Sequence, residues 1–347
     1  MPTERKGNVT IYEVAAEAGV AISTVSKVLS NKSGISAATR LKVQQAVEQL
    51  GYVPSLSARG LTGGQTGIIG LIYAFPPEKL FTDPYLLENL LGIEDALIDL
   101  DYNLLISTGR ESDLYSSFDR MLRSRYFDGV IIMETTEIHT LALHTRLKEQ
   151  NLPWVVMGYP GGIQPCYAVY ANDFQGGQMV AGHLLGLGHR RFAVIDTHVK
   201  PSGVDERLRG FRQVLEQHGV SIDPACIYYG DFTQESGYRA APSILDRPDR
   251  PTAIFSVNDR MALGVLKWAE EHGIAVPCDV SVTGFDDIAA AAISNPPLTT
   301  IRQPGIQIGR AVVDVVHRLI QGETPALETV CDTELVVRGT SGEARKC

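Results

Sequence analysis

The sequence predicts an all-α head of about sixty residues, followed by an α/β body with two doubly wound lobes. Three observations predict this fold class. Helix-period apolar patterns occupy the first fifty or so residues, apolar runs alternate with amphipathic helices from Gly67 onwards, and charge divides unequally between the two parts. At 347 residues the chain is long enough for two or three domains.

The charge difference between the two parts points to a nucleic-acid partner for the head. Residues 1–64 hold seven Lys and Arg against four Glu, a formal charge of +3. The whole chain carries −9, so the remainder carries −12. A small basic head on an acidic body is typical of a DNA-binding module joined to another domain.

The composition is that of a soluble protein, with 44% hydrophobic and 20% charged residues. The chain has no apolar run of about 18 residues for a membrane span, and its N-terminus lacks the apolar core of a signal peptide. We therefore expect a cytoplasmic protein. Its five cysteines are scattered without CxxC spacing, which predicts neither a disulfide framework nor a zinc site: Cys166, Cys226, Cys278, Cys331 and Cys347.

Three short helices are predicted in the head. Thr10 and Glu13 form a capping box at the start of the first helix, and Gly19 ends it. The second helix, Ile22–Leu29, has one apolar and one polar face, and Ser36 caps the third. A helix, a turn with Gly and a polar-faced helix are typical of a helix-turn-helix, whose second helix enters the major groove. The alternative is a plain three-helix bundle whose polar residues face water.

The order of residues in the head favours the helix-turn-helix interpretation. Residues 9–55 resemble, without a gap, the DNA-binding head of the lactose-repressor (LacI) family, in the pieces Val9–Ala15, Ala18–Val20, Thr24–Leu29, Thr39–Arg40 and Gly51–Pro54. The resemblance implies that Ile22, Ser23 and Lys27 read bases. It implies that seven other residues hold the DNA backbone or brace the fold: Thr10, Tyr12, Thr24, Ser26, Ser36, Thr39 and Tyr52.

Three positions depart from the usual pattern of that family. Ala21 stands where the family often has Ser, so the second helix lacks a side-chain N-cap. Ser30 stands where the family usually has Asn. Lys27 stands where Arg is common, and a lysine lacks the two-pronged donor that pairs with guanine. The sequence therefore predicts an operator that differs from those typical of the family.

Residues 55–64 connect the head to the body. In the resembling family this segment is a hinge helix that orders on operator DNA and inserts a leucine into the minor groove. Leu61 matches that leucine and Ala58 the small residue beside it. The alternative is a flexible linker with an incidental leucine.

The body alternates strands with helices, as βαβ units require. Strands are predicted at 68–73, 104–107, 129–133, 154–157, 192–195, 227–229, 253–256 and 280–283, and helices at 85–100, 179–187, 207–218 and 261–272. Ligands of doubly wound folds bind at the carboxyl ends of the strands. The body contains no GxxxxGK[ST], GxGxxG, HExxH or GxSxG motif, so we expect no enzymatic activity, cofactor or metal.

Polar residues follow several predicted strands. Arg207, Asn258 and Asp286 would suit a polyhydroxylated ligand, because each can bond adjacent hydroxyls. The alternative is that Asp259, Asp286 and Asp287 are N-caps of the helices that follow.

The resemblance extends into the body, where the matching pieces resemble the periplasmic-binding-protein-like sensor domain: Leu187–Arg191, Glu206–Phe211, Gly230–Phe232, Asn258–Gly264, Val280–Asp287 and Pro297–Ile301. It implies that Arg207, Asn258 and Asp286 contact an effector and that Phe232 stacks on it. Near the end of the first strand, another wall is expected from Tyr73, Phe75 and Tyr85. Sugar-binding relatives often carry an Asp at the position of Gly158, and the segment Pro76–Pro84 is long, so these two departures leave the identity of the effector open. A sugar or a sugar derivative is the expected effector.

The expected domains are a helix-turn-helix at 1–54, a hinge at 55–64, an effector-binding and dimerisation domain at 65–340, and a tail at 341–347. The lobes are expected at 65–168 plus 302–325 and at 169–301 plus 326–340. The predicted function is a repressor of a sugar-utilisation operon that binds a palindromic operator as a homodimer, with no membrane partner. The alternative is a periplasmic-type sugar-binding protein without a regulatory role, which the basic head disfavours.

Overall fold

The computed structural model describes residues 9–29, 33–52, 65–73, 75–109, 126–133, 144–161, 165–198 and 202–344. These residues fall into two compact units, one with the three N-terminal helices and one with the sheets and the other helices. The predicted hinge at 55–64 with Ala58 and Leu61 lies outside the described residues, as do Ser30 and Cys347. Within the described residues, none of the helices is long and apolar enough to cross a membrane.

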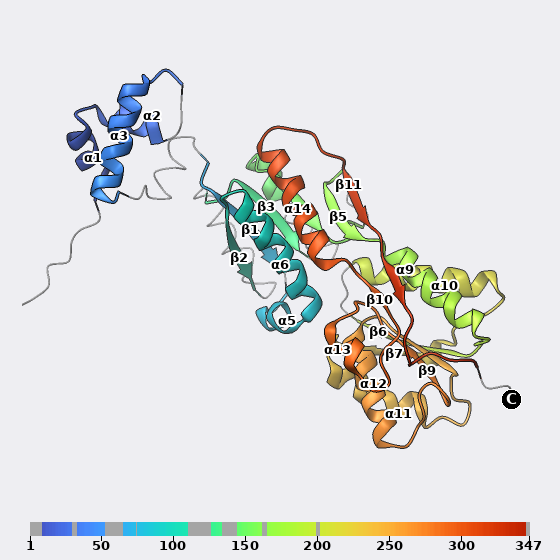
Figure 1. Cartoon of the computed structure of the whole chain (residues 1–347). Helices are drawn as coiled ribbons and strands as arrows, with labels where there is room; N and C mark the ends of the chain where they lie inside the picture. The colour runs from blue at the N-terminus through green and yellow to red at the C-terminus, as the bar shows by residue number, and fades with distance from the viewer. Residues whose placement is uncertain are drawn as a thin grey trace, which may run out of the picture. The chain divides into compact units, whose positions relative to one another are not determined.

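The helical unit is a bundle of α1 (Ile11–Ala18), α2 (Ile22–Leu29) and α3 (Ala37–Leu50) (Figure 1). The predicted capping box is present. The Thr10 side chain accepts a hydrogen bond from the Glu13 N–H, and the Glu13 carboxylate accepts one from the Thr10 N–H at 2.6 Å. These bonds satisfy N–H groups that the start of a helix leaves unpaired.

A small apolar core joins the three helices. Val14, Val25 and Val43, one from each helix, are completely buried. Gly19 and Gly51 end α1 and α3 in the left-handed conformation, each with φ of 63°, as the sequence predicted for Gly19. The core therefore fixes the orientation of α2 and leaves its other face free.

The first lobe of the larger unit is built on a six-stranded sheet of order β11-β5-β4-β3-β1-β2 (Figure 1). Neighbours from β11 to β1 pair in parallel. Helix α6 (Pro84–Asp99) packs against α14 (Gly305–Ile320), which contacts the sheet, and α5 (Pro77–Thr82) precedes α6. The strands are β1 (Ile68–Tyr73), β2 (Asn103–Thr108), β3 (Gly129–Met133), β4 (Trp154–Met157), β5 (Ala168–Ala171) and β11 (Glu328–Cys331).

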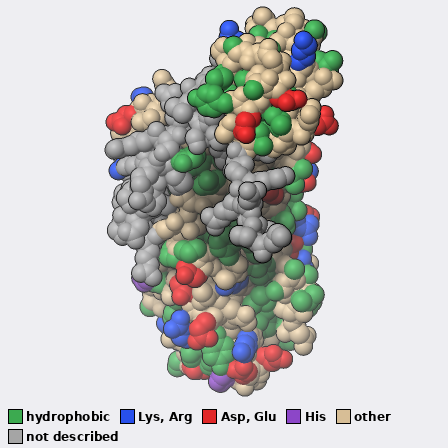
Figure 2. Space-filling model, turned by 90° about the vertical axis from the view of Figure 1, so that its left-hand side faces the viewer, with side chains coloured by type: hydrophobic (Ala, Val, Ile, Leu, Met, Phe, Trp, Pro, Cys, Tyr) green, Lys and Arg blue, Asp and Glu red, His purple; other side chains and the backbone are tan. Residues whose placement is uncertain are grey.

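The second lobe is built on a four-stranded parallel sheet of order β7-β6-β8-β9. Its strands are β6 (Phe192–Thr197), β7 (Ile227–Gly230), β8 (Ala253–Ser256) and β9 (Ser281–Thr283). Helix α9 (Asp173–Gly186) packs against α10 (Ser202–Gln217), and α11 (Gln234–Leu245) against α12 (Asp259–Glu271). The short elements η1 (Pro224–Cys226) and α13 (Ala289–Ile293) complete it. In the lower part of the face shown in Figure 2, acidic and basic side chains are interspersed.

The chain passes between the lobes at residues 171–173, 302–305 and 331–334, beside the antiparallel pair β10 (Thr300–Arg302) and β12 (Glu334–Val336). Residues 169–171 and 326–331 were predicted in the second lobe, but β5 and β11 belong to the sheet of the first lobe. Strand β11 alternates exposed with half-buried residues at the sheet edge and therefore lacks the continuous apolar run that identifies a buried strand. Strand β5 is an apolar run, but only its pairing with β4 and β11 assigns it to the first lobe.

Candidate functional site

On the helical unit, the residues predicted to read bases share the solvent-facing side of α2. Ile22 is 40% exposed, and Ser23 and Lys27 are exposed, whereas Val25 and Val28 are buried in the core. The side chains opposite the core are those a recognition helix presents to the major groove. The arrangement therefore suits the predicted contacts.

The other predicted residues of the head divide into two groups. Tyr12 is 69% exposed, and Thr24 and Ser26 are half-buried on α2. The remaining ones have partners inside the head: Thr10 caps α1, Ser36 accepts a hydrogen bond from the Thr39 N–H and caps α3, and Tyr52 is buried against the core. These contacts explain how Thr10, Ser36, Thr39 and Tyr52 stabilise the fold of the head.

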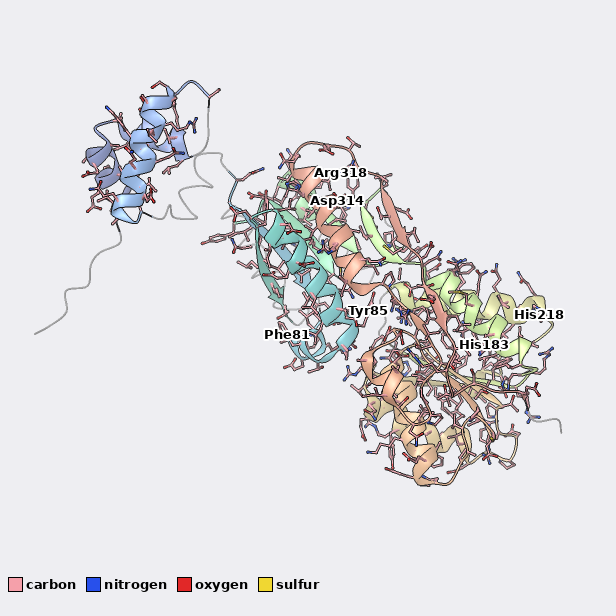
Figure 3. The ribbon with its side chains drawn as sticks, viewed as in Figure 1. Phe81, Tyr85, His183, His218, Asp314 and Arg318 are labelled. Atoms are coloured by element: carbon pink, nitrogen blue, oxygen red, sulfur yellow. The ribbon has the colours of Figure 1, made fainter. Side chains whose placement is uncertain are left out.

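In the larger unit, a cavity of about 240 Å³ lies between the two lobes. Its walls include the carboxyl ends of strands from both sheets, which is where doubly wound folds bind ligands. Figure 3 labels Tyr85 at the start of α6, at the end of the first lobe nearest the second lobe. All seven residues predicted to contact an effector line the cavity: Tyr73, Phe75, Tyr85, Arg207, Phe232, Asn258 and Asp286.

Arg207 is fixed at the polar wall of the cavity. Its Nε donates to Asp173 Oδ1 at 2.6 Å, and Nη1 donates to the Val257 carbonyl at 2.7 Å and lies 3.7 Å from Asp286 Oδ1. The guanidinium also lies over the Phe285 ring, 4.0 Å from its centroid. With so many partners, the buried charge is held in one geometry and compensated by carboxylates.

The two buried carboxyl groups beside Arg207 have shifted acidities. Burial raises the pKa of Asp173, and the Arg207 charge opposes this. Burial also raises the pKa of Asp286 well above its ordinary value, an effect that Arg207 opposes and the charge of Asp259 increases. Asp286 therefore retains a proton, and with it the ability to donate a hydrogen bond, to higher pH than an exposed carboxyl group.

Gln303 lines the cavity and was not among the residues predicted from the sequence. It is 2% exposed and follows β10 on the crossover into α14. Its Nε2 donates to Asp286 Oδ1 at 2.7 Å, while its Oε1 has no hydrogen-bond partner among the described residues. A buried unpaired acceptor in a cavity wall suits a ligand that donates a hydrogen bond there.

Asn258 positions the cavity wall through two hydrogen bonds. Its Oδ1 accepts from the Met261 N–H at 3.0 Å and so caps α12, and its Nδ2 donates to the Phe232 carbonyl at 3.1 Å. Phe232 has a left-handed φ of 71°, which this bond helps to hold. Asn258 thus fixes the aromatic ring that was predicted to stack on the effector.

The suggestion that the aspartates are helix caps is wrong for this cluster. Asp259 lies outside the cavity, is completely buried, and accepts hydrogen bonds from Thr300 Oγ1 at 2.5 Å and the Ile288 N–H at 3.0 Å. Asp287 pairs with two arginines, and α13 has no side-chain cap. Periodicity could not distinguish these roles, because the partners of Asp259 lie 29 and 41 residues away.

The long segment noted at Pro76–Pro84 forms α5 at the cavity. The Nζ atom of Lys79 lies 5.5 Å from the Phe75 ring centroid and 5.6 Å from that of Phe232, which belongs to the other lobe. Asp83 caps α6 through the Tyr85 N–H and approaches Arg260 of α12 at 3.4 Å. This segment therefore connects the two lobes by charged contacts.

Comparisons with known proteins match both units. Residues 10–55 match the family model "Bacterial regulatory proteins, lacI family", and residues 181–341 match "Periplasmic binding protein-like domain". The chain is 33% identical to the HTH-type transcriptional regulator CelR of Thermobifida fusca, with 96% of this chain and 99% of CelR aligned. This chain belongs to the LacI family. It is therefore a DNA-binding regulator of transcription, and the predicted fold class is confirmed.

Two further relatives of this LacI-family chain cover most of its length. The ribose operon repressor of Escherichia coli (strain K12) is 32% identical, with 90% of this chain and 93% of that protein aligned. The lac repressor dimer bound to operator and the anti-inducer ONPF superposes with a TM-score of 0.83 at 28% identity, over 97% of this chain and all of that one. The relatives are regulators rather than enzymes.

Proposed function

We propose that this protein is a ligand-responsive repressor of a sugar-utilisation operon and binds a palindromic operator as a homodimer. Relatives support each part. The CelR structure contains cellobiose (TM-score 0.74, 32% identity), a LacI-family regulator from Enterococcus faecium contains ribose, and the lac repressor structure is a dimer on its operator. A palindrome requires two heads, one for each half-site.

The observation that supports a sugar-like effector is the polar group formed by Arg207, Asp286 and Gln303 in a cavity with aromatic walls. The group presents a guanidinium, a carboxyl group and an unpaired amide oxygen at one wall. Hydroxyls both donate and accept hydrogen bonds, so a polyhydroxylated ligand can satisfy all three. Aromatic side chains then cover its apolar faces.

In this proposal the effector controls DNA binding through residues 55–64. The lobes would close around a bound ligand, and closure would shift the equilibrium of the hinge segment between an ordered and a disordered state. Leu61 would insert between base steps and Ala58 would allow close approach to the minor groove. These assignments come from the sequence resemblance alone.

The proposed reading helix can be tested by selecting sites from random double-stranded DNA with the full chain. Lys27→Ala on α2 is expected to lower affinity for the selected DNA site by about tenfold, which corresponds to the loss of one base contact. The variant should also discriminate less between bases at the position that Lys27 contacts. Lys42→Ala is the control, because Lys42 is an exposed lysine on α3. If Lys27→Ala keeps the same site and affinity, α2 does not read the operator.

The effector site is tested by calorimetry with sugars that raise the thermal stability of the full chain. Arg207→Ala and Asp286→Ala should abolish the effector response and leave basal DNA binding intact. Unchanged effector affinity in both would reject the cavity assignment. Deleting residues 1–64 should abolish operator binding and spare effector binding. DNA binding by the truncated chain would show that the domain assignment is wrong.

A further inference from the structure

We propose that Lys79 competes with the effector for two aromatic rings of the cavity and thereby sets the effector concentration at which the protein responds. The inference rests on the proposed function, because it concerns the same cavity. It depends on the contacts of the Lys79 ammonium group with rings of both lobes, on the way those rings are held, and on the weakness of the contacts.

Helix α5 carries Lys79 at the end of the first lobe that lies nearest the second lobe (Figure 1). Leu80, the next residue, is completely buried in the core of the first lobe and anchors the helix there. Consecutive residues of a helix point in different directions, so Lys79 does not share that core. It is half-buried and lines the cavity together with Glu78 and Asp83.

The ammonium group of Lys79 lies over two aromatic rings that belong to different lobes. Its Nζ atom is 5.5 Å from the ring centroid of Phe75 in the first lobe and 5.6 Å from that of Phe232 in the second lobe. Both distances allow a cation–π contact, in which the positive charge is attracted to the negative face of the ring. A sugar that stacks on these ring faces must take the place of the ammonium group.

Both rings are held by their own lobes. Phe75 is buried and packs against the Tyr73 ring, with centroids 5.5 Å apart. The backbone of Phe232 is held by the hydrogen bond that its carbonyl accepts from Asn258 Nδ2. The lysine side chain, by contrast, is a flexible four-carbon stem. When an effector enters, we therefore expect Lys79 to move and the rings to stay.

The contacts of Lys79 are weak enough for an effector to replace them. Within the described part of the chain, the two ring contacts are the interactions of its ammonium group, and no carboxylate lies within ion-pair distance of it. Arg207 differs, because Asp173 and the Val257 carbonyl both accept hydrogen bonds from it. Lys79 can therefore leave the cavity, whereas Arg207 remains in its wall.

Competition by Lys79 lowers the effector affinity that an experiment measures. The effector binds only the fraction of molecules in which the lysine has left the rings, and the apparent affinity falls by that fraction. Removal of the ammonium group should therefore tighten effector binding. Removal of a residue that contacts the effector should weaken it, so the sign of the change separates the two roles.

Calorimetry on the full chain measures this sign, with ribose, xylose, glucose, galactose, cellobiose and maltose as probes. Lys79→Ala is expected to bind at least one of these sugars about fivefold more tightly than the wild type does. Lys79→Arg keeps a cation and should stay within about twofold of the wild type. Lys267→Ala is the matched control and should leave the affinity unchanged, because the Lys267 Nζ atom lies 5.6 Å from the Tyr238 ring centroid and Lys267 does not line the cavity.

The outcomes of this titration separate the competition from the proposed function. Equal or weaker sugar binding by Lys79→Ala, or equally tight binding by Lys79→Arg and Lys79→Ala, would overturn the competition and keep the proposed function. Binding of no sugar by the wild type and by Lys79→Ala would overturn both.

A double-mutant cycle tests the contact with Phe232 without any sugar. Lys79→Ala should lower the thermal unfolding midpoint of the full chain by about 2 °C. In the Phe232→Leu background the same change should lower it by only about half as much, because leucine has no π face and the Phe75 contact alone is left. An equal effect in both backgrounds would show that the ammonium group does not lie over Phe232 and would overturn the proposal.

Discussion

Asp259 is expected to make the stability of the larger unit fall as pH rises. Burial raises the pKa of Asp259 to about 7, against an ordinary value of 3.8, although Thr300 and the Ile288 N–H bond its carboxylate. Because the folded-state pKa is the higher one, the folded state binds more protons between these values. The stabilisation is therefore complete below about pH 4 and is lost as pH rises through about 7.

The magnitude follows from the separation of the two pKa values. Each pH unit between them changes the free energy of unfolding by about 1.4 kcal/mol. Between about pH 5 and pH 8 the contribution of Asp259 should fall by up to about 3 kcal/mol. Asp259→Asn removes this titration and keeps the shape, because its amide can donate to Thr300 Oγ1 and its carbonyl can accept from the Ile288 N–H.

Urea unfolding followed by tryptophan fluorescence measures the effect in the full chain. Both tryptophans, Trp154 and Trp268, belong to the larger unit, so the signal reports its unfolding alone. Asp249→Asn is the control, since Arg247 lowers the pKa of that exposed carboxyl group. If the wild type and Asp259→Asn lose stability in parallel between about pH 5 and pH 8, the assignment of the titration to Asp259 is wrong.

Three further changes test the packing, the lobe contact and the hinge. Gly177→Ala places a methyl group 1.9 Å from the Arg207 carbonyl oxygen and should lower the free energy of unfolding in urea by about 3 kcal/mol. Gly182→Ala, on the same helix, meets no atom within 4 Å and should leave that free energy unchanged or raise it. Equal stabilities of the two variants would contradict the close packing of α9 on α10. Arg260→Gln removes the contact with Asp83 and should lower the affinity for an enclosed effector about fivefold at low salt. The difference from the wild type should disappear at high salt, because salt screens the charges. If effector affinity has the same salt dependence in the wild type and the variant, the contact does not link the lobes. Leu61→Ala should weaken specific operator binding by a few kcal/mol in a gel-shift titration and spare effector affinity, and equal operator affinity would reject the wedge.

Local sequence patterns predicted most elements because their causes are local. The strands at 129–133, 154–157 and 253–256 have the predicted bounds, since each is a short apolar run buried in a sheet. The capping box of Thr10 and Glu13 is a contact between residues three apart. The polar face of α2 follows from the same helical period that buries Val25 and Val28.

The partners within the cavity could not be predicted in this way. Arg207 binds Asp173 from 34 residues away, and Asp83 meets Arg260 across 177 residues, so no spacing rule connects them. Asp173 begins α9 just after β5, a four-residue strand whose place in the sheet follows only from its pairing with β4 and β11. Without that strand, neither Asp173 nor Tyr170 is recognisable as a cavity residue.

The sequence by itself determined the two-part organisation, the helix-turn-helix and seven of the residues that line the cavity, because charge, periodicity and family resemblance are properties of the linear chain. Only the tertiary structure decided what each polar group does there. In the folded chain Asp286 lines the cavity, whereas Asp259 lies outside it and connects α12 to Thr300 by a hydrogen bond. The structure also showed that Gln303, with its unpaired Oε1, lines the cavity. The physical reason is that burial and hydrogen-bond partners depend on segments that meet only when the sheets are assembled.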